Sequence, residues 1–405
     1  MPGQSLRAAT SIQIELHGRA SGPPAGLVTL IERFDPAMID VPSGSARIRL
    51  AVDEEGQWDA AIDGGAIELR PAGNRQPDAV LSADRATWEE IARDVRGGMV
   101  AFRQGRLTVR QNLHLGVGFL AASSAIADER RLRFASIRTR VCKISTLSAG
   151  EGNPVICVHG LGGTKASFLP TVAALADDYR VIAMDLPGFG DSDKPIAASY
   201  DAAYFAGAIE ALLDELEIER AHLIGNSMGG RVAIELGLLR PERTEKIALL
   251  SPALAWLRSR RWRWLLQAPL PMLGLVQPAP RAITEPIVRN LVPGGKDGWS
   301  AAGVDEFLRS YLTPRGRLAF YEAARKIYLD EPHGEHGFWT RLAEMSPQTL
   351  FIWGRHDQLA PIGFMKHVER VLPAARHLEL DCGHVPQLEA PKETHHAIQE
   401  FFAGT

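Results

Sequence analysis

Residues 225–230 read Gly-Asn-Ser-Met-Gly-Gly, and this stretch decides the fold of the larger part of the chain. It matches the pattern G-x-S-x-G and lies between an apolar strand candidate at 222–225 and a helical pattern at 231–239. In that context the serine sits on a sharp strand-to-helix turn with its hydroxyl exposed for reaction. Ser227 is therefore the candidate nucleophile.

Three glycines surround Ser227, and each has a steric reason to be there. The sharp turn needs small residues two positions away on either side, which Gly225 and Gly229 supply. Gly230 lets the following helix approach the sheet. The start of a helix also presents free N–H groups and the positive end of its dipole, which stabilise a developing oxyanion.

Short apolar runs alternate with helical segments from about Leu132 to the end of the chain. Several runs are apolar at consecutive positions, as in parallel strands buried on both faces. The strand candidates are VICV (155–158), VIAM (181–184), HLIG (222–225), KIALL (246–250), LFIW (350–353) and HLEL (377–380), with a helix at 201–216. This alternation predicts an α/β fold with a doubly wound, mostly parallel sheet.

A serine hydroxyl needs a base to take its proton and a carboxylate to orient that base. His384 lies in DCGHVPQLEAP (381–391), just after the last strand candidate, and Asp357 lies in WGRHDQLAP (353–361), after the strand before it. The chain order Ser, Asp, His is the order used by this kind of strand–turn–helix motif. We predict Ser227, Asp357 and His384 as a catalytic triad.

The stretch His159 to Gly163 reads HGLGG and follows the strand candidate 155–158. Small residues such as Gly160 allow main-chain N–H groups to face a substrate oxygen, so the N–H groups of Leu161 and Met228 are the predicted oxyanion hole. The place of His159 inside this motif favours a structural role over a role as the base.

Together these motifs resemble the α/β-hydrolase superfamily over residues 132–405, and MDLPGFGDS (184–192) after a strand is also typical of it. The resemblance implies a helical cap, here an insertion at about 253–346. GNSMGG is similar to both esterases and the meta-cleavage C–C bond hydrolases. The latter usually carry a proline in the oxyanion loop and a tryptophan after the catalytic histidine, whereas this chain has LGG (161–163) and Val385, which favours esters.

The first 130 residues follow a different pattern. Apolar and polar residues alternate at 48–52 and 58–62, as in half-buried strands of an antiparallel sheet. A short helix at 87–93, a strand at 106–110 and an apolar helix at about 113–125 are also predicted. The stretches AVLSADRATW (79–88) and MVAFRQGRLTVRQNL (99–113) resemble the sterol carrier protein 2 family, which implies a smaller α+β domain that binds lipid or acyl chains.

We therefore expect two domains, a lipid-binding domain with its linker at 1–128 and a hydrolase domain at 129–405. The linker would fall within the charged stretch 126–135.

The overall charge and composition argue against several classes of function. A net charge of −3 over 405 residues gives no strong attraction to nucleic acid. Three cysteines without a CxxC pair, and no signal peptide or long apolar run, favour a cytoplasmic location. The stretch 256–266, WLRSRRWRWLL, invites a membrane-surface hypothesis, but its arginines interrupt the apolar face, which favours a cap helix. No metal-ligand spacing or phosphate-binding loop is present, so we expect no metal and no cofactor.

The leading functional prediction is a carboxylic ester hydrolase that acts on an apolar, lipid-like ester through an acyl-enzyme, with a small-molecule ester as its partner. The first alternative is hydrolysis of a C–C bond in a β-diketone-like ring-fission product by the same triad. The second alternative is a lipid carrier whose hydrolase domain is vestigial.

Overall fold

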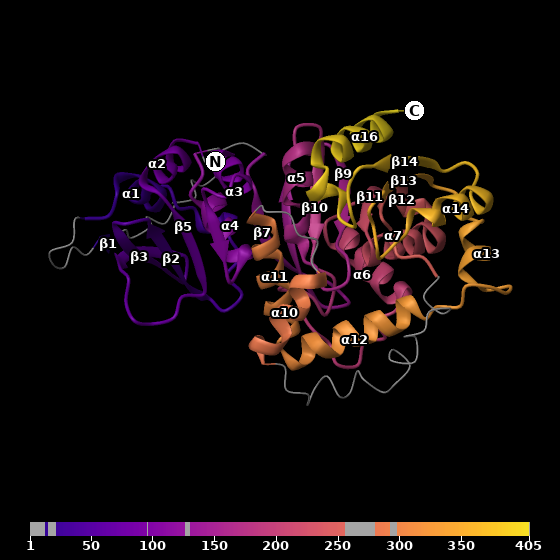
Figure 1. The fold of residues 1–405 in the computed structure, drawn as a ribbon, viewed down its shortest axis with the longest axis horizontal. Helices are drawn as coiled ribbons and strands as arrows, with labels where there is room; N and C mark the ends of the chain where they lie inside the picture. The colour runs from indigo at the N-terminus through magenta and orange to yellow at the C-terminus, as the bar shows by residue number, and fades with distance from the viewer. Residues whose placement is uncertain are drawn as a thin grey trace, which may run out of the picture. The chain divides into compact units, whose positions relative to one another are not determined.

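The computed structural model describes residues 13–14, 22–94, 96–125, 130–255, 280–291 and 298–404. The chain forms two compact units, Met1–Arg133 and Phe134–Thr405, drawn in Figure 1 from indigo to violet and from magenta to yellow.

An eight-stranded sheet forms the centre of the larger unit, in the order β14-β13-β12-β11-β9-β10-β8-β7. Neighbouring strands from β9 to β14 run parallel, whereas β8 pairs antiparallel with β10. The strands are β7 (Arg133–Arg138), β8 (Lys143–Ala149), β9 (Asn153–Val158), β10 (Tyr179–Met184), β11 (Ala221–Asn226), β12 (Thr244–Leu250), β13 (Gln348–Gly354) and β14 (Arg376–Leu380). All six predicted strands are confirmed, and so is the mostly parallel sheet.

The helices after the strands are α5 (Leu169–Leu175), α6 (Ala202–Glu215), α7 (Met228–Leu239), α14 (Met365–Val371), α15 (Pro386–Glu389) and α16 (Pro391–Ala403). The predicted helix at 201–216 is α6, and Asp201 caps it by accepting a hydrogen bond from the Tyr204 N–H at 2.8 Å. Helix α7 begins at Met228, three residues earlier than predicted, and ends before Pro241, whose ring cannot continue a helix.

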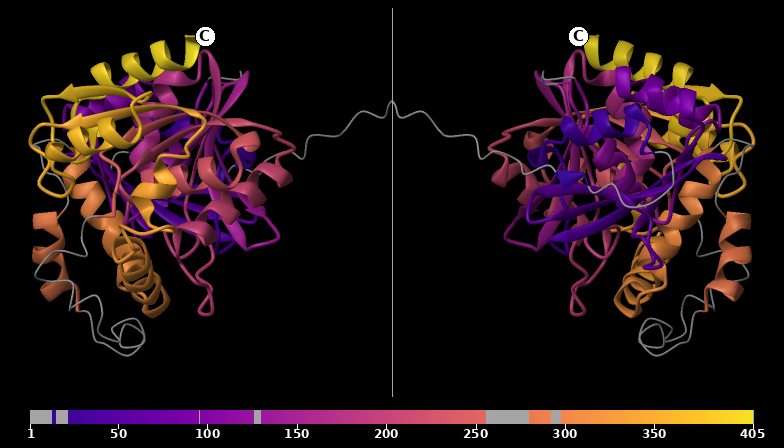
Figure 2. Two further views of the ribbon diagram at one scale, coloured as in Figure 1. Left: turned by 90° about the vertical axis from the view of Figure 1, so that its right-hand side faces the viewer. Right: turned by 90° about the vertical axis from the view of Figure 1, so that its left-hand side faces the viewer.

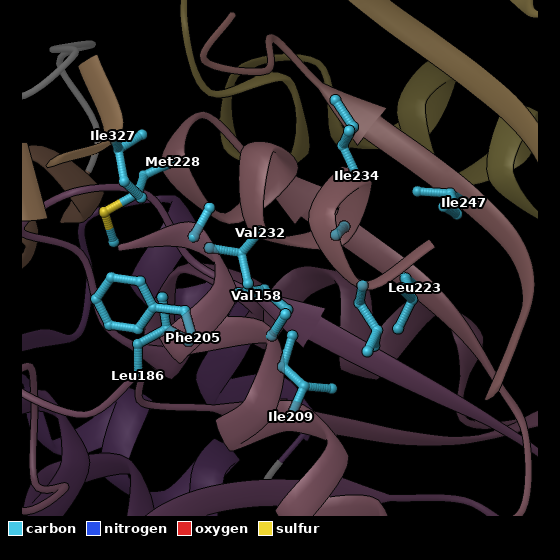
Figure 3. Packing of buried hydrophobic residues seen from close by; sticks show 14 of the residues in the cluster. Val158, Leu186, Phe205, Ile209, Leu223, Met228, Val232, Ile234, Ile247 and Ile327 are labelled. Atoms are coloured by element: carbon cyan, nitrogen blue, oxygen red, sulfur yellow. The ribbon is translucent and has the colours of Figure 1, made fainter. Parts of the chain in front are cut away.

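The core of the larger unit lies between the sheet and helices α6 and α7 (Figure 3). Val158, Leu223 and Ile247 come from three adjacent strands, and Ile209 and Val232 come from the helices. All five side chains are fully buried. Burying such a side chain contributes about 1.5–3 kcal/mol, so this layer fixes the position of the β11–α7 turn.

We call residues 251–347, between β12 and β13, the insertion, and four helices lie in its described parts (251–255, 280–291 and 298–347). They are α10 (Arg281–Leu291), α11 (Gly298–Tyr311), α12 (Pro314–Tyr328) and α13 (Phe338–Leu342). Helices α12 and α16 lie on opposite sides of the larger unit (Figures 1 and 2). The membrane-surface hypothesis concerned residues 256–266, which lie outside the described residues. Within the described part of the chain, no helix combines the length and apolar character needed to cross a bilayer.

The smaller unit contains a six-stranded sheet in the order β1-β4-β3-β2-β5-β6. Its strands are β1 (Gln13–Ile14), β2 (Ser45–Val52), β3 (Gly56–Asp63), β4 (Ala66–Pro71), β5 (Ala79–Ala83) and β6 (Thr108–Arg110). The predicted antiparallel pairing holds for β2 and β3, where Leu50 lies opposite Trp58. The sheet is nevertheless mixed, because residues 72–78 cross over two strands and bring β5 alongside β2 in the same direction.

Helices α1 (Ala25–Glu32), α2 (Arg85–Arg93), α3 (Arg96–Arg103) and α4 (Leu113–Ala122) accompany this sheet. Trp88 of α2 and Phe119 of α4 are fully buried, and the Trp88 indole N–H donates to the Ala51 carbonyl at 3.0 Å. The unit is an α+β domain, as predicted. Lipid binding by this unit stays a prediction.

Candidate active site

Ser227 lies between the end of β11 and the first residue of α7, with φ 53° and ψ −117°. A positive φ is rare for a residue with a side chain and costs of order 1–3 kcal/mol. The turn is held by hydrogen bonds on both sides: the Ser227 N–H donates to the Leu250 carbonyl at 3.0 Å, and the Ser227 carbonyl accepts from the Ala253 N–H at 2.8 Å. The strained turn expected from the motif is therefore present in the structure.

The glycines around Ser227 make contacts that no larger residue would allow. A methyl group on Gly225 would lie 2.4 Å from the Gly229 carbonyl oxygen, and one on Gly229 would lie 2.0 Å from the Val158 carbonyl oxygen. At Gly230 a methyl group would lie 2.8 Å from Cβ of Pro252. These three positions let helix α7 approach the ends of the sheet strands.

His384 and Asp357 are brought together from the loops after β14 and β13. Nδ1 of His384 and Oδ2 of Asp357 are 2.7 Å apart. The other oxygen of Asp357 accepts hydrogen bonds from the N–H groups of Leu359 and Ala360 at 2.7 and 2.8 Å. Burial opposes ionisation of Asp357, but the hydrogen bonds from His384 and the two amides hold the pKa of this carboxyl below its usual value. An ionised Asp357 fixes the ring orientation of His384, as a base of this kind requires.

Two residues that the sequence analysis did not single out fasten the His384 loop. Glu389 accepts hydrogen bonds from the N–H groups of Gly383 and Val385, on either side of His384, at 2.7 and 2.9 Å. Asn226, the residue before Ser227, donates from Nδ2 to the His384 carbonyl at 3.0 Å. Asn226 lies within the serine motif, so the sequence could have indicated its role. The role of Glu389 depends on how its loop folds, which the sequence does not show.

The HGLGG stretch lies beside Ser227, because a methyl group on Gly160 would be 3.1 Å from Cβ of Ser227. Leu161 directly follows Gly160, and Met228 is the first residue of α7, so both predicted oxyanion residues adjoin residues next to the Ser227 turn. His159 is fully buried: its Nε2 accepts from the Leu186 N–H at 3.0 Å, and its Nδ1 is 2.8 Å from the Gly160 carbonyl. Both ring nitrogens of His159 are thus engaged by the main chain, which suits a structural residue.

Helix α11 of the insertion is fastened to the loops around this stretch by buried charges. Arg309 donates to Asp191 at 2.5 Å and to Glu306 at 2.9 Å, and Asp191 also accepts from Lys165 at 3.2 Å. Lys165 is buried and pairs with Asp185 at 2.6 Å. Paired buried charges are costly to separate, so α11 is held against the residues that follow HGLGG.

The same helix places an aromatic ring on the predicted oxyanion loop. The Phe307 ring lies against Gly162, where a methyl group would be only 2.2 Å from it. Phe307 belongs to a group of aromatic rings from α11 and α12 with centroids 5.3–5.5 Å apart, the others being Tyr311 and Phe320. The insertion therefore brings aromatic surface next to the residues that would hold a substrate carbonyl.

Within the described residues, no three His, Cys, Asp or Glu side chains gather in a way that could hold a metal ion.

Residues 153–391 match the family described as the alpha/beta hydrolase fold. The fold, the serine turn and the neighbouring His–Asp pair agree with that match, and the chain belongs to this family. The match begins at residue 153 and does not include the smaller unit.

Individual relatives have different substrates. The chain is 30% identical over 276 residues to a 2-hydroxy-6-oxo-6-phenylhexa-2,4-dienoate hydrolase of Comamonas testosteroni, which spans 62% of this chain and 88% of the relative. Among solved structures, a meta-cleavage product hydrolase of Pseudomonas fluorescens has a TM-score of 0.54 at 26% identity and covers 67% of this chain and 97% of its own. A bacterial membrane phospholipase A has a TM-score of 0.55 at 27% identity and covers 67% and 86%.

Proposed function

We propose that the chain hydrolyses carboxylic esters with apolar acyl groups through an acyl-enzyme on Ser227. The observation that carries the proposal is the constellation at the carboxyl ends of the strands. Ser227 is held on a strained turn beside Gly160, and His384 is hydrogen-bonded to Asp357 in the loop tied to Asn226. A nucleophile, a base and an orienting carboxylate in chain order are what acyl transfer requires.

In the proposed reaction His384 takes the proton of the Ser227 hydroxyl as its oxygen attacks the ester carbonyl. The negative charge on the carbonyl oxygen is stabilised by the N–H groups of Leu161 and Met228. His384 returns the proton to the leaving alcohol, and a water molecule then cleaves the acyl-enzyme by the same route. Asp357 stays ionised and stabilises the imidazolium form of His384.

Two features favour an ester with an apolar acyl group. Phe307 lies on Gly162 of the predicted oxyanion loop, so apolar surface adjoins the position of the carbonyl. The predicted oxyanion loop reads LGG (161–163) and Val385 follows His384, whereas the C–C bond hydrolases usually carry a proline in that loop and a tryptophan after the histidine. The similarity to a bacterial membrane phospholipase A supports this choice.

The second candidate is hydrolysis of a C–C bond next to a carbonyl, by the same serine and histidine. The specific observation in its favour is the 30% identity to a dienoate hydrolase over most of that protein. In both reactions a nucleophile attacks a carbonyl and an oxyanion forms. The leaving group is an alcohol in ester hydrolysis and a carbon atom in C–C bond hydrolysis.

The deciding experiment compares p-nitrophenyl esters, from acetate to palmitate, with a 2-hydroxy-6-oxo-dienoate under the same conditions. We expect a higher kcat/KM on an ester of intermediate or long chain than on the dienoate, and a loss of about 10⁴-fold or more in kcat for Ser227→Ala. Ser82→Ala, a serine in β5 of the smaller unit, is the matched control and should keep the wild-type rate. A dienoate preference would replace ester hydrolysis by the second candidate.

A further inference from the structure

The main chain around His384 is held by hydrogen bonds from three separate parts of the fold. One of the peptide groups involved joins Cys382 to Gly383. Its carbonyl accepts a hydrogen bond from the His356 N–H at 3.0 Å, and its N–H donates to Oε2 of Glu389 at 2.7 Å. Since the residue after His356 is the orienting carboxylate, this peptide group is tied to the loop that carries the acid of the triad.

The peptide group that joins His384 to Val385 is bonded in the same way. Its carbonyl accepts from Nδ2 of Asn226 at 3.0 Å, and its N–H donates to Oε1 of Glu389 at 2.9 Å. Asn226 directly precedes Ser227, so this peptide group is tied to the serine turn. The two N–H groups are thus held by the two oxygens of one carboxylate, and the two carbonyls by the segments that carry the acid and the nucleophile.

These contacts fix the direction in which the His384 side chain leaves the main chain. A residue has two soft main-chain torsions, and the peptide groups on either side of it define them. The peptide between Gly383 and His384 is closely packed as well, because a methyl group on Gly354 would lie 1.9 Å from the Gly383 carbonyl oxygen. Nδ1 of His384 is 2.7 Å from Asp357, so a fixed Cβ also fixes Nε2, the nitrogen that takes the Ser227 proton in the proposed reaction.

Glu389 holds these two peptide groups relative to each other. Its side chain is exposed, so water can accept a hydrogen bond from either N–H once the carboxylate is removed. Two independent water molecules do not keep the two N–H groups at a fixed separation, as the two oxygens of one carboxylate do. Hydrogen bonds to a carboxylate are also about twice as strong as those between neutral groups. Loss of Glu389 should therefore loosen His384 while the fold of the unit remains.

We propose that Glu389 is a positioning residue, which aligns His384 with Ser227 by fixing the peptide groups on both sides of the base. In this role it touches neither the substrate nor the reacting atoms, and no proton passes through it. The inference rests on the proposed function, because it takes Ser227 as the nucleophile and His384 as the base. The purely structural alternative is that Glu389 only closes the first turn of α15, which begins at Pro386, one residue after Val385.

The test uses a fluorophosphonate probe, which reacts with a nucleophilic serine and does not depend on the natural substrate. The second-order rate of inactivation of the full chain is compared for the wild type, Glu389→Gln and Glu393→Gln. Glutamine keeps one acceptor oxygen but places an N–H donor against the second main-chain N–H. Glu393, in the first turn of α16, is the matched control, because its substitution removes the same charge nearby. We expect a rate about tenfold lower for Glu389→Gln and within about twofold of the wild type for Glu393→Gln.

Two further measurements separate alignment of the base from stability of the loop. On a p-nitrophenyl ester, a misaligned base lowers kcat and leaves KM unchanged, whereas a displaced loop raises KM. Glu389→Asp keeps the charge and both oxygens but retracts them by one methylene group. Its rate should lie between those of the wild type and Glu389→Gln, and this variant decides the question if Glu389→Gln does not fold.

A double-mutant cycle with Asp357→Asn gives the sharpest distinction. If Glu389 acts through the alignment of His384, its substitution has little left to disturb once the orienting carboxylate is gone. Glu389→Gln should then slow the Asp357→Asn protein by less than about twofold, because residues that act as a unit are strongly non-additive. A carboxylate that only stabilises the loop would slow both backgrounds by the same factor.

The outcomes are distinct. A wild-type protein that the probe does not label contradicts the proposed function itself, and the role of Glu389 with it. A labelled wild type with Glu389→Gln reacting at the same rate overturns the role of Glu389 and leaves the proposed function standing. An equal loss in Glu393→Gln, or an equal factor in both backgrounds of the cycle, does the same.

Discussion

Replacing Asp330 by asparagine should destabilise the larger unit by leaving a buried arginine short of a counter-charge. Arg231 is 2% exposed, its guanidinium carbon lies 3.9 Å from the centre of the Phe338 ring, and it pairs with Asp330 and, at 3.5 Å, with Glu235. Burial lowers the pKa of Arg231 to about 10 even with both acids present, so the charge is already costly to hold.

The size of the effect follows from how much of the pair is buried. Removing one partner of a fully buried ion pair costs about 3–5 kcal/mol. Asp330 is 31% exposed and Glu235 remains beside Arg231, so we expect about half of that, roughly 2 kcal/mol. For a unit of this size, this corresponds to a fall in Tm of about 4–8 °C. Arg231→Met, which removes the buried charge and keeps its volume, should cost about 1 kcal/mol or less.

Differential scanning calorimetry of the full chain measures both variants, with the transition of the smaller unit as the internal reference. The asymmetry between the two variants is the test. If Asp330→Asn shifts the Tm of the larger unit by less than about 1 °C, or if Arg231→Met is as damaging, then the charge of Arg231 does not depend on Asp330 and the reasoning is refuted.

Three other variants test separate parts of the molecule. Asp357→Asn should lower kcat on an ester by about 10³–10⁴-fold in a folded protein, because the amide no longer fixes the His384 ring; a loss below tenfold would argue against this role. Ser227→Gly should raise stability by about 1 kcal/mol by removing strain at φ 53°, and Ser227→Ala, which keeps the strain, should not; equal Tm values would contradict this. In the smaller unit, burial of Asp59 removes water from its carboxylate, which by itself would raise the pKa of this group. Hydrogen bonds to the carboxylate, the strongest of them from Arg49, outweigh this effect and hold the pKa below its usual value. Its ionised form therefore adds stability that is complete above the unfolded pKa of about 3.9 and is lost as the pH falls through the lower folded pKa, so calorimetry of Asp59→Asn should show a flatter fall in Tm below about pH 4.

The sheet of the larger unit could be predicted because its strands are written as consecutive apolar residues. Three of these strands are apolar at every position and therefore differ from half-exposed surface strands, in which apolar and polar residues alternate: VICV, VIAM and LFIW. A loop or helix signal follows each of them. The positions of Ser227, Asp357 and His384 at strand ends followed directly from that pattern. Their meeting in space is a property of parallel strands, whose carboxyl ends share one edge.

Other parts of the site have no local signal. Glu389 accepts hydrogen bonds from the Gly383 and Val385 N–H groups only because the loop after β14 turns back on itself, and nothing in the sequence around Glu389 marks this role. The sequence does not predict that β5 is a parallel neighbour of β2, because the crossover connection at residues 72–78 has no hydrophobic periodicity. Pairing across long stretches of chain is decided by tertiary packing, which local patterns do not record.

The insertion leaves the sheet at the end of β12 and returns at β13, which is the adjacent strand, with Leu250 opposite Ile352. Because the two strands are parallel, the insertion leaves at the carboxyl end of β12 and returns at the start of β13, where Gln348 lies opposite Lys246. Four residues of strand rise and one strand spacing therefore separate its two ends by about 14 Å, a distance that the sheet itself fixes. The entropic cost of closing a loop grows only with the logarithm of the loop length, so doubling the length of the insertion costs about 0.6 kcal/mol. Segments of very different length and helix content can thus be exchanged at this point without changing strand register, which makes the β12–β13 junction a natural place to graft a new specificity onto this protein.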